Sequence, residues 1–473
     1  MWDVSSEDIT EGPLIRALVV LALPLLVQNI VQVVQQVVDL FWLGRLSGDA
    51  VAAVGLTFPL VGLLYAAVLI APYVGTQVLV SQRVGNDDER GAQVAAYTGV
   101  TLALACGLSI GVLAFISARP LVEVLLSARP DGVATHVSQL ATVYFGTIAL
   151  GVVAAAMSDA LEGAFVGRGD SRAALYISIA TVIVNLALDP ILIFGVGAVP
   201  ALGIRGAALA TVAGYTAGFI LAVLFVFQGR SKRVLSRQTI HHDLSEYREL
   251  LDIGFPSALQ TASRQVVRLV IVAVVFTIGG TAGLAAYIVG TRISSIAFIP
   301  AFGLQQAAQS VVGQNVGANR PDRASRATWA GITLISGLLA MIGIIQWFIP
   351  GAIADMIAPT LAPQATSFAV TFLRVLAIGY PALGAVYLLQ AGFNGARRTR
   401  VSMISSIVQF WAIRLPIAAA GGLLLGYGMP AVFWAVAISN ILGAVGLGAY
   451  YQYSTDAGMF QHAAQQAQQA AVE

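Results

Sequence analysis

Two carboxylates and one amide stand out because they lie inside long apolar stretches of the sequence. Asp39 is near the end of the first stretch, and Asn185 and Asp189 lie four residues apart on the fifth. Residues four apart share one face of a helix, so Asn185 and Asp189 point the same way. Pro190 cannot donate to the carbonyl of Leu186, which leaves a backbone acceptor and favours a kink. Ionised, such oxygens can hold Na⁺; in low dielectric the neutral acid is favoured, and the site can exchange a proton.

The composition places these side chains in a membrane. Hydrophobic residues make up 58% of the 473-residue chain and charged residues only 10%, against roughly 25% charged in soluble proteins. So few charges cannot cover a soluble core of this size, which excludes a water-soluble enzyme. Disorder is excluded because it needs low hydrophobicity and high charge. A net charge of +2 does not indicate nucleic-acid binding.

Neither metal nor cofactor chemistry is indicated. The single cysteine, Cys106, cannot form an intrachain disulfide, and with four histidines it makes no metal-ligand spacing. No glycine-rich loop ends in Gly-Lys-Ser or Gly-Lys-Thr, so we expect no nucleotide cofactor and no ATP-driven pumping by this chain. A gradient-driven carrier or a facilitator remains.

The sequence contains twelve apolar runs, each long enough to cross a hydrocarbon layer of about 30 Å as a helix. They are continuous and lack period-2 alternation, which argues against a β-barrel. We therefore predict an all-α integral membrane protein with spans at residues 14–43, 50–80, 93–117, 137–164, 173–196, 207–228, 248–277, 284–312, 327–349, 365–393, 401–425 and 430–452.

Arginine and lysine set the orientation. Sixteen of the 25 basic residues lie in segments on the side of the N-terminus and four on the other side. Basic residues favour the cytoplasmic side, so the sequence predicts a multi-pass cell-membrane protein with both termini in the cytoplasm. The remaining five basic residues lie inside spans, where they either snorkel, pair with carbonyls or line a cavity: Arg264, Arg268, Arg292, Arg374 and Arg414.

The chain also repeats itself. Gln82-Arg83-Val84-Gly85 reappears in the second half as Gln314-Asn315-Val316-Gly317, and Gly163–Gly167 is echoed there by Ala391–Gly395. Six helices per copy give both copies the same orientation, and substrate sites of such proteins lie between the copies. We predict a first lobe at residues 1–228, a cytoplasmic linker at 229–247, a second lobe at 248–453 and a cytoplasmic tail at 454–473. From Gln461 the tail is rich in Gln and Ala, which indicates a solvated or weakly helical segment.

Depth in the membrane brings further polar residues to the first-lobe acids. Spans 1 and 5 run outward and spans 4 and 6 run back. Asp39 and Asp189 fall late in their spans, and Tyr144 and Thr211 fall early in theirs. All four therefore reach the outer half of one lobe, where with Asn185 they can share a polar pocket.

Other polar residues are candidates for lining the cavity. Gln32, Gln35 and Gln36 precede Asp39 on span 1 and make one face partly polar. Ser158 and Asp159 lie near the inner end of span 4. For Asp159 and the neighbouring Glu162 we favour ion pairs with Arg168 and Arg172 over a role in transport.

Purely structural alternatives stay open for the main candidates. Asp39 can reach the outer interface, and Asp189 can belong to a turn at Pro190, although apolar residues continue beyond that proline. Asn185 can serve as an interhelical donor. Tyr144 and Thr211 are types common at membrane interfaces and helix contacts.

This pattern resembles the multidrug and toxic compound extrusion (MATE) transporters over about residues 12–453. The resemblance rests on Pro24 and Asp39 on span 1, the Gln82–Gly85 and Gln314–Gly317 loops, the Gly163–Asp170 turn and the Asn185–Pro190 motif. The last motif is most similar to the prokaryotic DinF-like branch. The polar residue that the family carries on span 4 before the glycine-rich turn is not clearly reproduced, since Ser158 and Asp159 occupy that region.

The resemblance implies a V-shaped, two-lobed protein working by rocker-switch alternating access. It implies efflux of amphipathic, often cationic, compounds in exchange for H⁺ or Na⁺. The coupling site maps to Asp39, Asn185 and Asp189, with Tyr144 and Thr211 matching by position. Protonation of the span-1 acid is proposed in related proteins to bend that helix at its proline, here Pro24.

We therefore expect an antiporter whose partners are small organic molecules, H⁺ or Na⁺ and the lipid bilayer, acting as a monomer. A lipid-linked oligosaccharide flippase is the nearest alternative: the second-lobe arginines favour it, and the paired first-lobe acids argue against it. A facilitator without ion coupling also remains, whereas a non-transporting scaffold gives no reason for polar clusters at depth.

Overall fold

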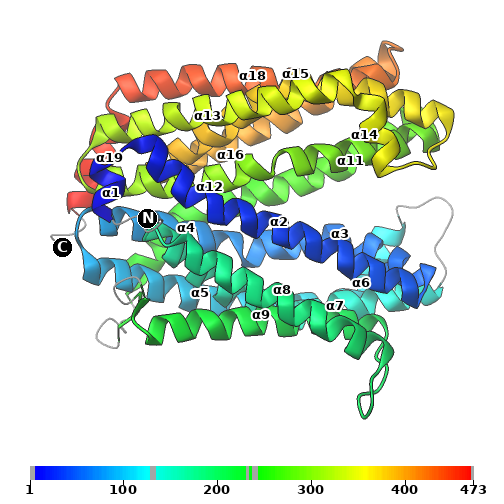
Figure 1. Ribbon diagram of the computed structural model, residues 1–473, viewed down its shortest axis with the longest axis horizontal. Coiled ribbons are helices and arrows are strands. Elements are labelled where there is room, and N and C mark those ends of the chain that lie inside the picture. The colour runs from blue at the N-terminus through cyan, green and yellow to red at the C-terminus, as the bar shows by residue number, and fades with distance from the viewer. Residues whose placement is uncertain (1–5, 128–134, 231–233, 237–242, 470–473) are drawn as a thin grey trace.

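The computed structural model describes residues 6–127, 135–230, 234–236 and 243–469, most of which are helical. Long helices lie side by side in two groups, one above the other in Figure 1. The lower group, which we call the first lobe, contains α2 (Leu14–Leu46), α3 (Gly48–Val68), α4 (Ile70–Gly85), α5 (Glu89–Ile116), α6 (Ala118–Ser127), α7 (Thr135–Gly167), α8 (Ser171–Phe194) and α9 (Ile204–Phe227).

The upper group, the second lobe, repeats this arrangement. The elements of the second lobe are α11 (Leu244–Ala297), α12 (Ile299–Gly317), α13 (Pro321–Phe348), α14 (Pro350–Ile357), α15 (Pro363–Gly395), α16 (Thr399–Ile407), the π-helical turn η2 (Val408–Arg414), α17 (Leu415–Ala419), the π-helical turn η3 (Ala420–Leu424), α18 (Met429–Asp456) and α19 (Met459–Gln469). A short N-terminal helix, α1 (Ser6–Glu11), packs against α12.

The predicted all-helical membrane fold is confirmed. Eleven helices, counting α3 with α4 and α16 through η3 as one each, are long and apolar enough to cross a membrane in the part of the chain that the structure describes. One of them, α11, contains the predicted span 248–277 and the first part of the span 284–312, which continues in α12. The two parts of α11 are divided at Gly280, whose φ is positive (φ 56°, ψ −152°). Glycine adopts this conformation without a Cβ clash. Gly280 is the repeat partner of Gly48, the first residue of α3, so both lobes change direction at the same register.

The repeat extends to the backbone of the loops. The repeat partners Asp87 and Asn319 have φ of 57° and 54°, and a second equivalent pair, Gly169 and Arg397, has φ of 89° and 61°. All four end a long helix in the left-handed conformation that typically terminates helices. Arg397 holds this conformation without being glycine, and its guanidinium is bound by Glu249 and Gln82.

The two lobes contact each other through hydrogen bonds that correspond in the two halves of the repeat. Gln82 Nε2 donates to the carbonyl of Gly395 at 2.7 Å, and Gln314 Nε2 donates to the carbonyl of Gly167 at 2.8 Å. Gln309 Nε2 donates to Oε1 of its own repeat partner, Gln77, at 2.7 Å. The predicted repeat motifs are therefore the surfaces by which the lobes meet.

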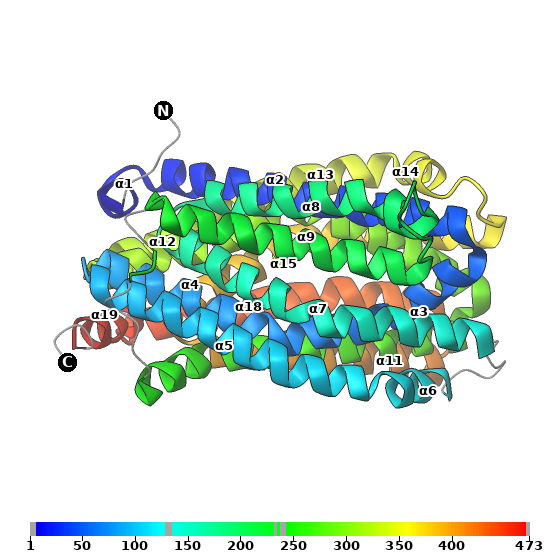
Figure 2. The same ribbon diagram turned by 90° about the horizontal axis from the view of Figure 1, so that it is seen from below.

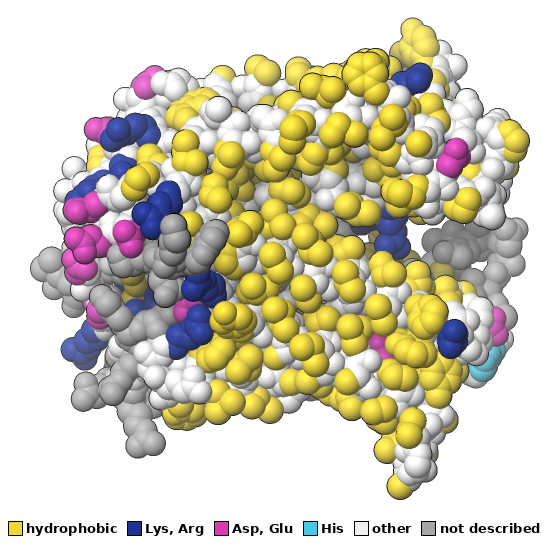
Figure 3. All heavy atoms as spheres, in the orientation of Figure 1, with side chains coloured by type: hydrophobic (Ala, Val, Ile, Leu, Met, Phe, Trp, Pro, Cys, Tyr) yellow, Lys and Arg dark blue, Asp and Glu magenta, His cyan; other side chains and the backbone are white. Residues whose placement is uncertain are grey.

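The contact closes one end of the molecule only. Helices α1 and α19 lie at that end in both ribbon views (Figures 1 and 2), which we call the terminal end. Figure 3 shows charged side chains gathered there, a belt of hydrophobic side chains across the middle, and a hollow between the lobes at the opposite end. The hollow contains basic side chains.

The tail differs from the prediction of a solvated or weakly helical segment. Met459–Gln469 forms α19, which packs against α12 and α13. Phe460, Ala463, Ala464 and Ala467 are buried on one face. The spacing of three and four residues gives a continuous apolar stripe, and the small alanine side chains let the helix lie close to its neighbours.

Close approach of the lobes at the terminal end depends on glycine. A Cβ at Gly317 would lie 1.8 Å from the backbone oxygen of Gln82, which cannot move as a side chain can. We expect Gly317→Ala to lower the thermal midpoint in detergent, at a cost of about 1–3 kcal/mol for overpacking. Gly337→Ala is the matched control, because a Cβ there meets no atom within 4 Å. A Gly317→Ala protein at least as stable as wild type would contradict this contact.

Candidate functional site

The site consists of the first-lobe acids on α2 and α8. Asn185 and Asp189 are 0% and 1% exposed, and Asp39 is half-buried opposite them. Oriented so that both ends of its amide are satisfied, Asn185 donates from Nδ2 to Asp39 Oδ1 at 2.9 Å. Asp39 and Asp189 lie close enough to each other to interact. A hydrogen bond between two carboxyl groups needs a proton on one of them, whereas two ionised groups need a cation between them.

Residues from α9 and α7 complete the pocket. The backbone N–H of Thr211 donates to Asn185 Oδ1 at 3.2 Å. Tyr144 lies within electrostatic range of both Asp39 and Asp189. The structure therefore brings together all five residues that the sequence assigned to this site. Asp189 Oδ2 is buried without a hydrogen-bond partner among the described residues. A buried oxygen of this kind is satisfied by a proton on the carboxyl group or by a cation beside it.

Neither predicted proline ends its helix, and one of the three span-1 glutamines approaches the site. Helix α8 continues past Pro190 to Phe194, so Asp189 does not belong to a turn. Helix α2 likewise continues through Pro24. Gln35 approaches Asn185 to 2.9 Å, whereas Gln32 and Gln36 are exposed.

A second polar cluster lies deeper in the same lobe, where we favoured an ion pair with Arg168 or Arg172. That interpretation is wrong for Glu162, whose Oε2 accepts from Gln28 Nε2 of α2 at 2.8 Å. Arg168 pairs instead with Glu89 at 2.8 Å. The reason is rotational: Glu162 lies on the face of α7 that packs inside the lobe.

Asp159 is next to this cluster, and two unpredicted tyrosines belong to it. Tyr65 of α3 and Tyr215 of α9 meet edge to face with their ring centres 6.4 Å apart, and both lie within electrostatic range of Asp159. Ser158 is buried, and its hydroxyl has no partner among the described residues. The sequence feature that could have identified Tyr65 and Tyr215 is a single tyrosine among small and aliphatic residues in the middle of a span.

Candidate metal ligands do not converge elsewhere. No group of three or more His, Cys, Asp or Glu side chains meets within the described residues. The oxygens at Asp39, Asn185 and Asp189 therefore remain the candidate ligands for Na⁺.

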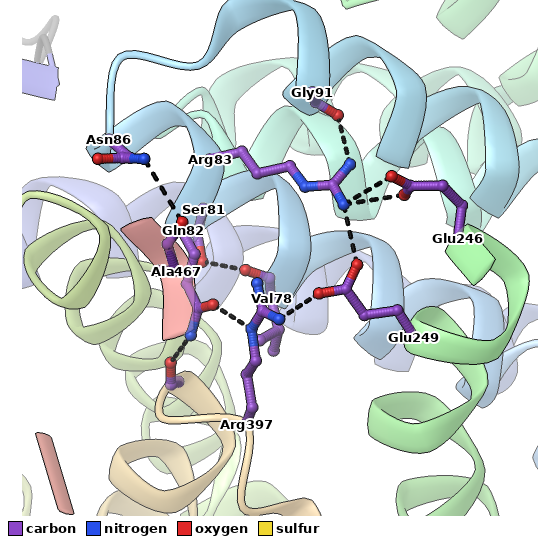
Figure 4. A network of polar contacts seen from close by, with 11 residues as sticks. Val78, Ser81, Gln82, Arg83, Asn86, Gly91, Glu246, Glu249, Arg397 and Ala467 are labelled. Carbon is purple, nitrogen blue, oxygen red and sulfur yellow. Dashed lines mark hydrogen bonds and ion pairs between the residues drawn. The ribbon is translucent and has the colours of Figure 1, made fainter. Parts of the chain in front are cut away.

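At the terminal end, an arginine network ties the lobes together (Figure 4). Arg83, at the end of α4, binds both Glu246 and Glu249 of α11 at 2.9 Å, and its Nη1 donates to the carbonyl of Gly91 at 2.8 Å. Arg397, which follows α15 in the second lobe, also binds Glu249. The Arg83 side chain is only 9% exposed, so these contacts are shielded from solvent. Burial raises the pKa of Glu246, and the neighbouring Arg83 opposes this shift.

The MatE family model matches twice, at residues 24–191 and 256–420, once in each lobe. The chain belongs to the MATE transporter family. It is therefore a membrane transporter and not an enzyme.

Relatives of this MATE protein span its length. It is 27% identical over 447 residues to a FAD transporter of Shewanella oneidensis, covering 93% of this chain and 94% of the relative. It is 27% identical over 428 residues to the multidrug resistance protein NorM of Burkholderia vietnamiensis, covering 88% and 89%. A solved outward-facing multidrug resistance MATE transporter matches with a TM-score of 0.88 at 21% identity, covering 96% of this chain and 99% of that one. That likeness concerns the fold.

Proposed function

We propose that this MATE protein is a secondary active antiporter that exports amphipathic organic compounds in exchange for H⁺ or Na⁺. The observation that carries the proposal is the contact of Asp39 with Asn185 and Asp189 inside the first lobe. Charged groups within a membrane are costly, about 2.5–3.5 kcal/mol each on insertion scales, and are retained where they bind ions or relay protons. The contact joins two helices, so occupancy by a cation can change how α2 packs on α8.

The mechanism we propose is competition between ion and substrate. H⁺ or Na⁺ enters the acid pocket from the hollow at the open end, changes the contact of Asp39 with α8 and weakens substrate binding. Pro24 lies within α2, where the missing hydrogen bond allows the helix to bend. The lobes then rock about their contact at the terminal end. We propose that this end, with both termini, faces the cytoplasm, and that the protein is nearest to the DinF-like branch.

The names of the relatives bear on the substrate. One is a multidrug resistance protein and another a FAD transporter. They support export of organic compounds, and FAD shows that an organic anion is among the compounds to test beside the cations that the family resemblance implies.

Flux measurements in proteoliposomes test this function. Vesicles are loaded with a fluorescent lipophilic cation, and a pH gradient or a Na⁺ gradient is imposed separately. We expect one gradient to drive flux against the substrate gradient, which identifies the coupling ion. Downhill flux that ignores both gradients would replace the antiporter with a facilitator. Movement of lipid-linked oligosaccharide alone would replace it with a flippase.

A further inference from the structure

The second lobe concentrates positive charge inside the membrane without any acid to balance it. Between residues 253 and 455 the sequence contains only two carboxylates, Asp322 and Asp355. Asp322 is in the first turn of α13 and Asp355 is on the short helix α14. The arginines within the spans of this lobe therefore have no neighbouring acid on those spans. Each such charge needs a functional reason in a membrane.

Two of these arginines lie at one aromatic ring. The guanidinium of Arg414 is 4.3 Å from the centre of the Phe410 ring, and that of Arg264 is 5.8 Å from the same ring. Arg264 is also 6.0 Å from the centre of the Tyr387 ring. Like charges repel, so two guanidinium groups around one ring favour a bound anion between or beside them. We call Arg264, Arg414, Phe410 and Tyr387 the arginine chamber.

The chamber holds more donors than acceptors. Ser406 Oγ lies 3.0 Å from Arg264 Nη2, 2.6 Å from Gln260 Nε2 and 3.1 Å from Gln390 Nε2, so three donors converge on one hydroxyl. Arg264 Nε is buried and has no hydrogen-bond partner among the described residues. A buried charged donor without a partner is costly, and an anionic oxygen would satisfy it.

Neither snorkelling nor carbonyl pairing explains these arginines. Arg264 bonds to the side chains of Gln390 and Ser406, and Arg414 bonds to Ser439 at 2.8 Å and Asn440 at 2.6 Å. All these partners are polar side chains of the same lobe. Arg414 also ends the π-helical turn Val408–Arg414, and π-helical turns are frequent at functional sites.

Helix α11, which carries Arg264, contacts α3 of the first lobe beside the chamber. Gln265, next to Arg264 on α11, meets Gly62 of α3 in the first lobe so closely that a Cβ there would lie 2.0 Å from its Nε2. Arg268, one turn beyond Arg264, is exposed and makes no hydrogen bond or ion pair with a described residue. Basic side chains are visible in the hollow between the lobes in Figure 3.

We propose that the arginine chamber binds the phosphate or carboxylate group of an aromatic substrate, so that the second lobe selects organic anions. Guanidinium groups bind such oxygens bidentately, and the rings of Phe410 and Tyr387 supply stacking partners for a planar ring. The inference rests on the proposed transport function and assigns its substrate class. The same chemistry is offered by a soluble aromatic phosphate and by a phospholipid headgroup.

Paired probes that differ by one phosphate test the proposal on the purified full-length protein. Flavin mononucleotide and riboflavin share a ring system, and short-chain phosphatidic acid and diacylglycerol share acyl chains. We expect the phosphate-bearing member of one pair to bind about 10- to 100-fold more tightly, as charge-assisted hydrogen bonds imply. A preference in the flavin pair supports the aromatic substrate, and a preference in the lipid pair alone replaces it with a phospholipid headgroup.

Variants connect the preference to the chamber. Arg264→Gln and Arg414→Gln, at half-buried positions, should each remove most of it. Arg268→Gln, at an exposed position one turn from Arg264, should reduce it and serves as the second variant if the other two do not fold. Arg374→Gln is the matched control, since Arg374 is an exposed arginine on α15 without a place in the chamber. Equal binding within both pairs, or a preference that survives in a folded Arg264→Gln or Arg268→Gln protein, overturns the proposal.

This binding measurement needs no ion gradient. It can therefore fail while gradient-driven flux persists, and flux can fail while the phosphate preference persists. Failure of the substrate assignment is thus distinguishable from failure of the antiporter.

Discussion

Asp39→Asn and Asp189→Asn are each expected to reduce gradient-driven efflux about 5- to 150-fold, the range of a typical coupling free energy between two ligands. Asparagine keeps the shape of the side chain but can neither carry the exchanged proton nor ionise. Its amide oxygen can still ligate Na⁺, so a Na⁺-coupled protein should keep a weak Na⁺ dependence and an H⁺-coupled one should lose coupling fully. Uphill flux in the proteoliposome assay measures both.

The matched control is Asp355→Asn, the same chemical change at an exposed carboxylate on α14 of the other lobe. It should transport like wild type. Undiminished uphill flux in both Asp39→Asn and Asp189→Asn, with normal amounts of protein in the vesicles, would remove the acid pocket from the mechanism.

Arg83→Ala is expected to open the terminal end. It leaves Glu246 and Glu249 without their shared partner, and removing one member of a buried ion pair costs about 3–5 kcal/mol. The glutamates are 20% and 26% exposed, so solvent reduces the loss here to about 1–3 kcal/mol. The closed arrangement of the lobes should lose population accordingly.

Cysteine labelling reads out this opening. Ser81 is fully buried at the lobe contact, so Ser81→Cys in a Cys106→Ala background should react slowly with a water-soluble maleimide, and about tenfold faster after Arg83→Ala, as about 1.4 kcal/mol implies. Arg119→Ala is the control because its ion pair with Glu123 is 81% and 55% exposed, and surface pairs contribute little. Unchanged labelling would show that the network does not hold the lobes together.

Mild acidification should increase labelling of Ser81→Cys in the same direction as Arg83→Ala, since burial raises the pKa of Glu246 and its protonation removes one ion pair.

Much of the site was predictable because its signals are local. An acid within an apolar run is conspicuous, and Asn185 and Asp189 share a face because residues four apart in a helix lie on the same side. The depth argument also placed Tyr144 and Thr211 with them, since the direction of each span follows from counting spans. The neighbouring Glu162 was harder, because its proximity to Arg168 in sequence suggested an ion pair, whereas the rotation of α7 turns its carboxylate toward Gln28.

The sequence by itself determined the membrane environment, the twelve spans and the repeat, since hydropathy, glycine and turn residues act over a few helical turns. Only the tertiary structure decided that Gln28 of α2 binds Glu162 of α7, that Arg83 reaches two glutamates of α11, and that Arg264 and Arg414 share one ring. A helical sequence defines which side chains share a face but not which helix packs against that face. In a membrane nearly every face is apolar, so hydrophobic periodicity does not choose the neighbour; close glycine contacts and a few polar side chains do.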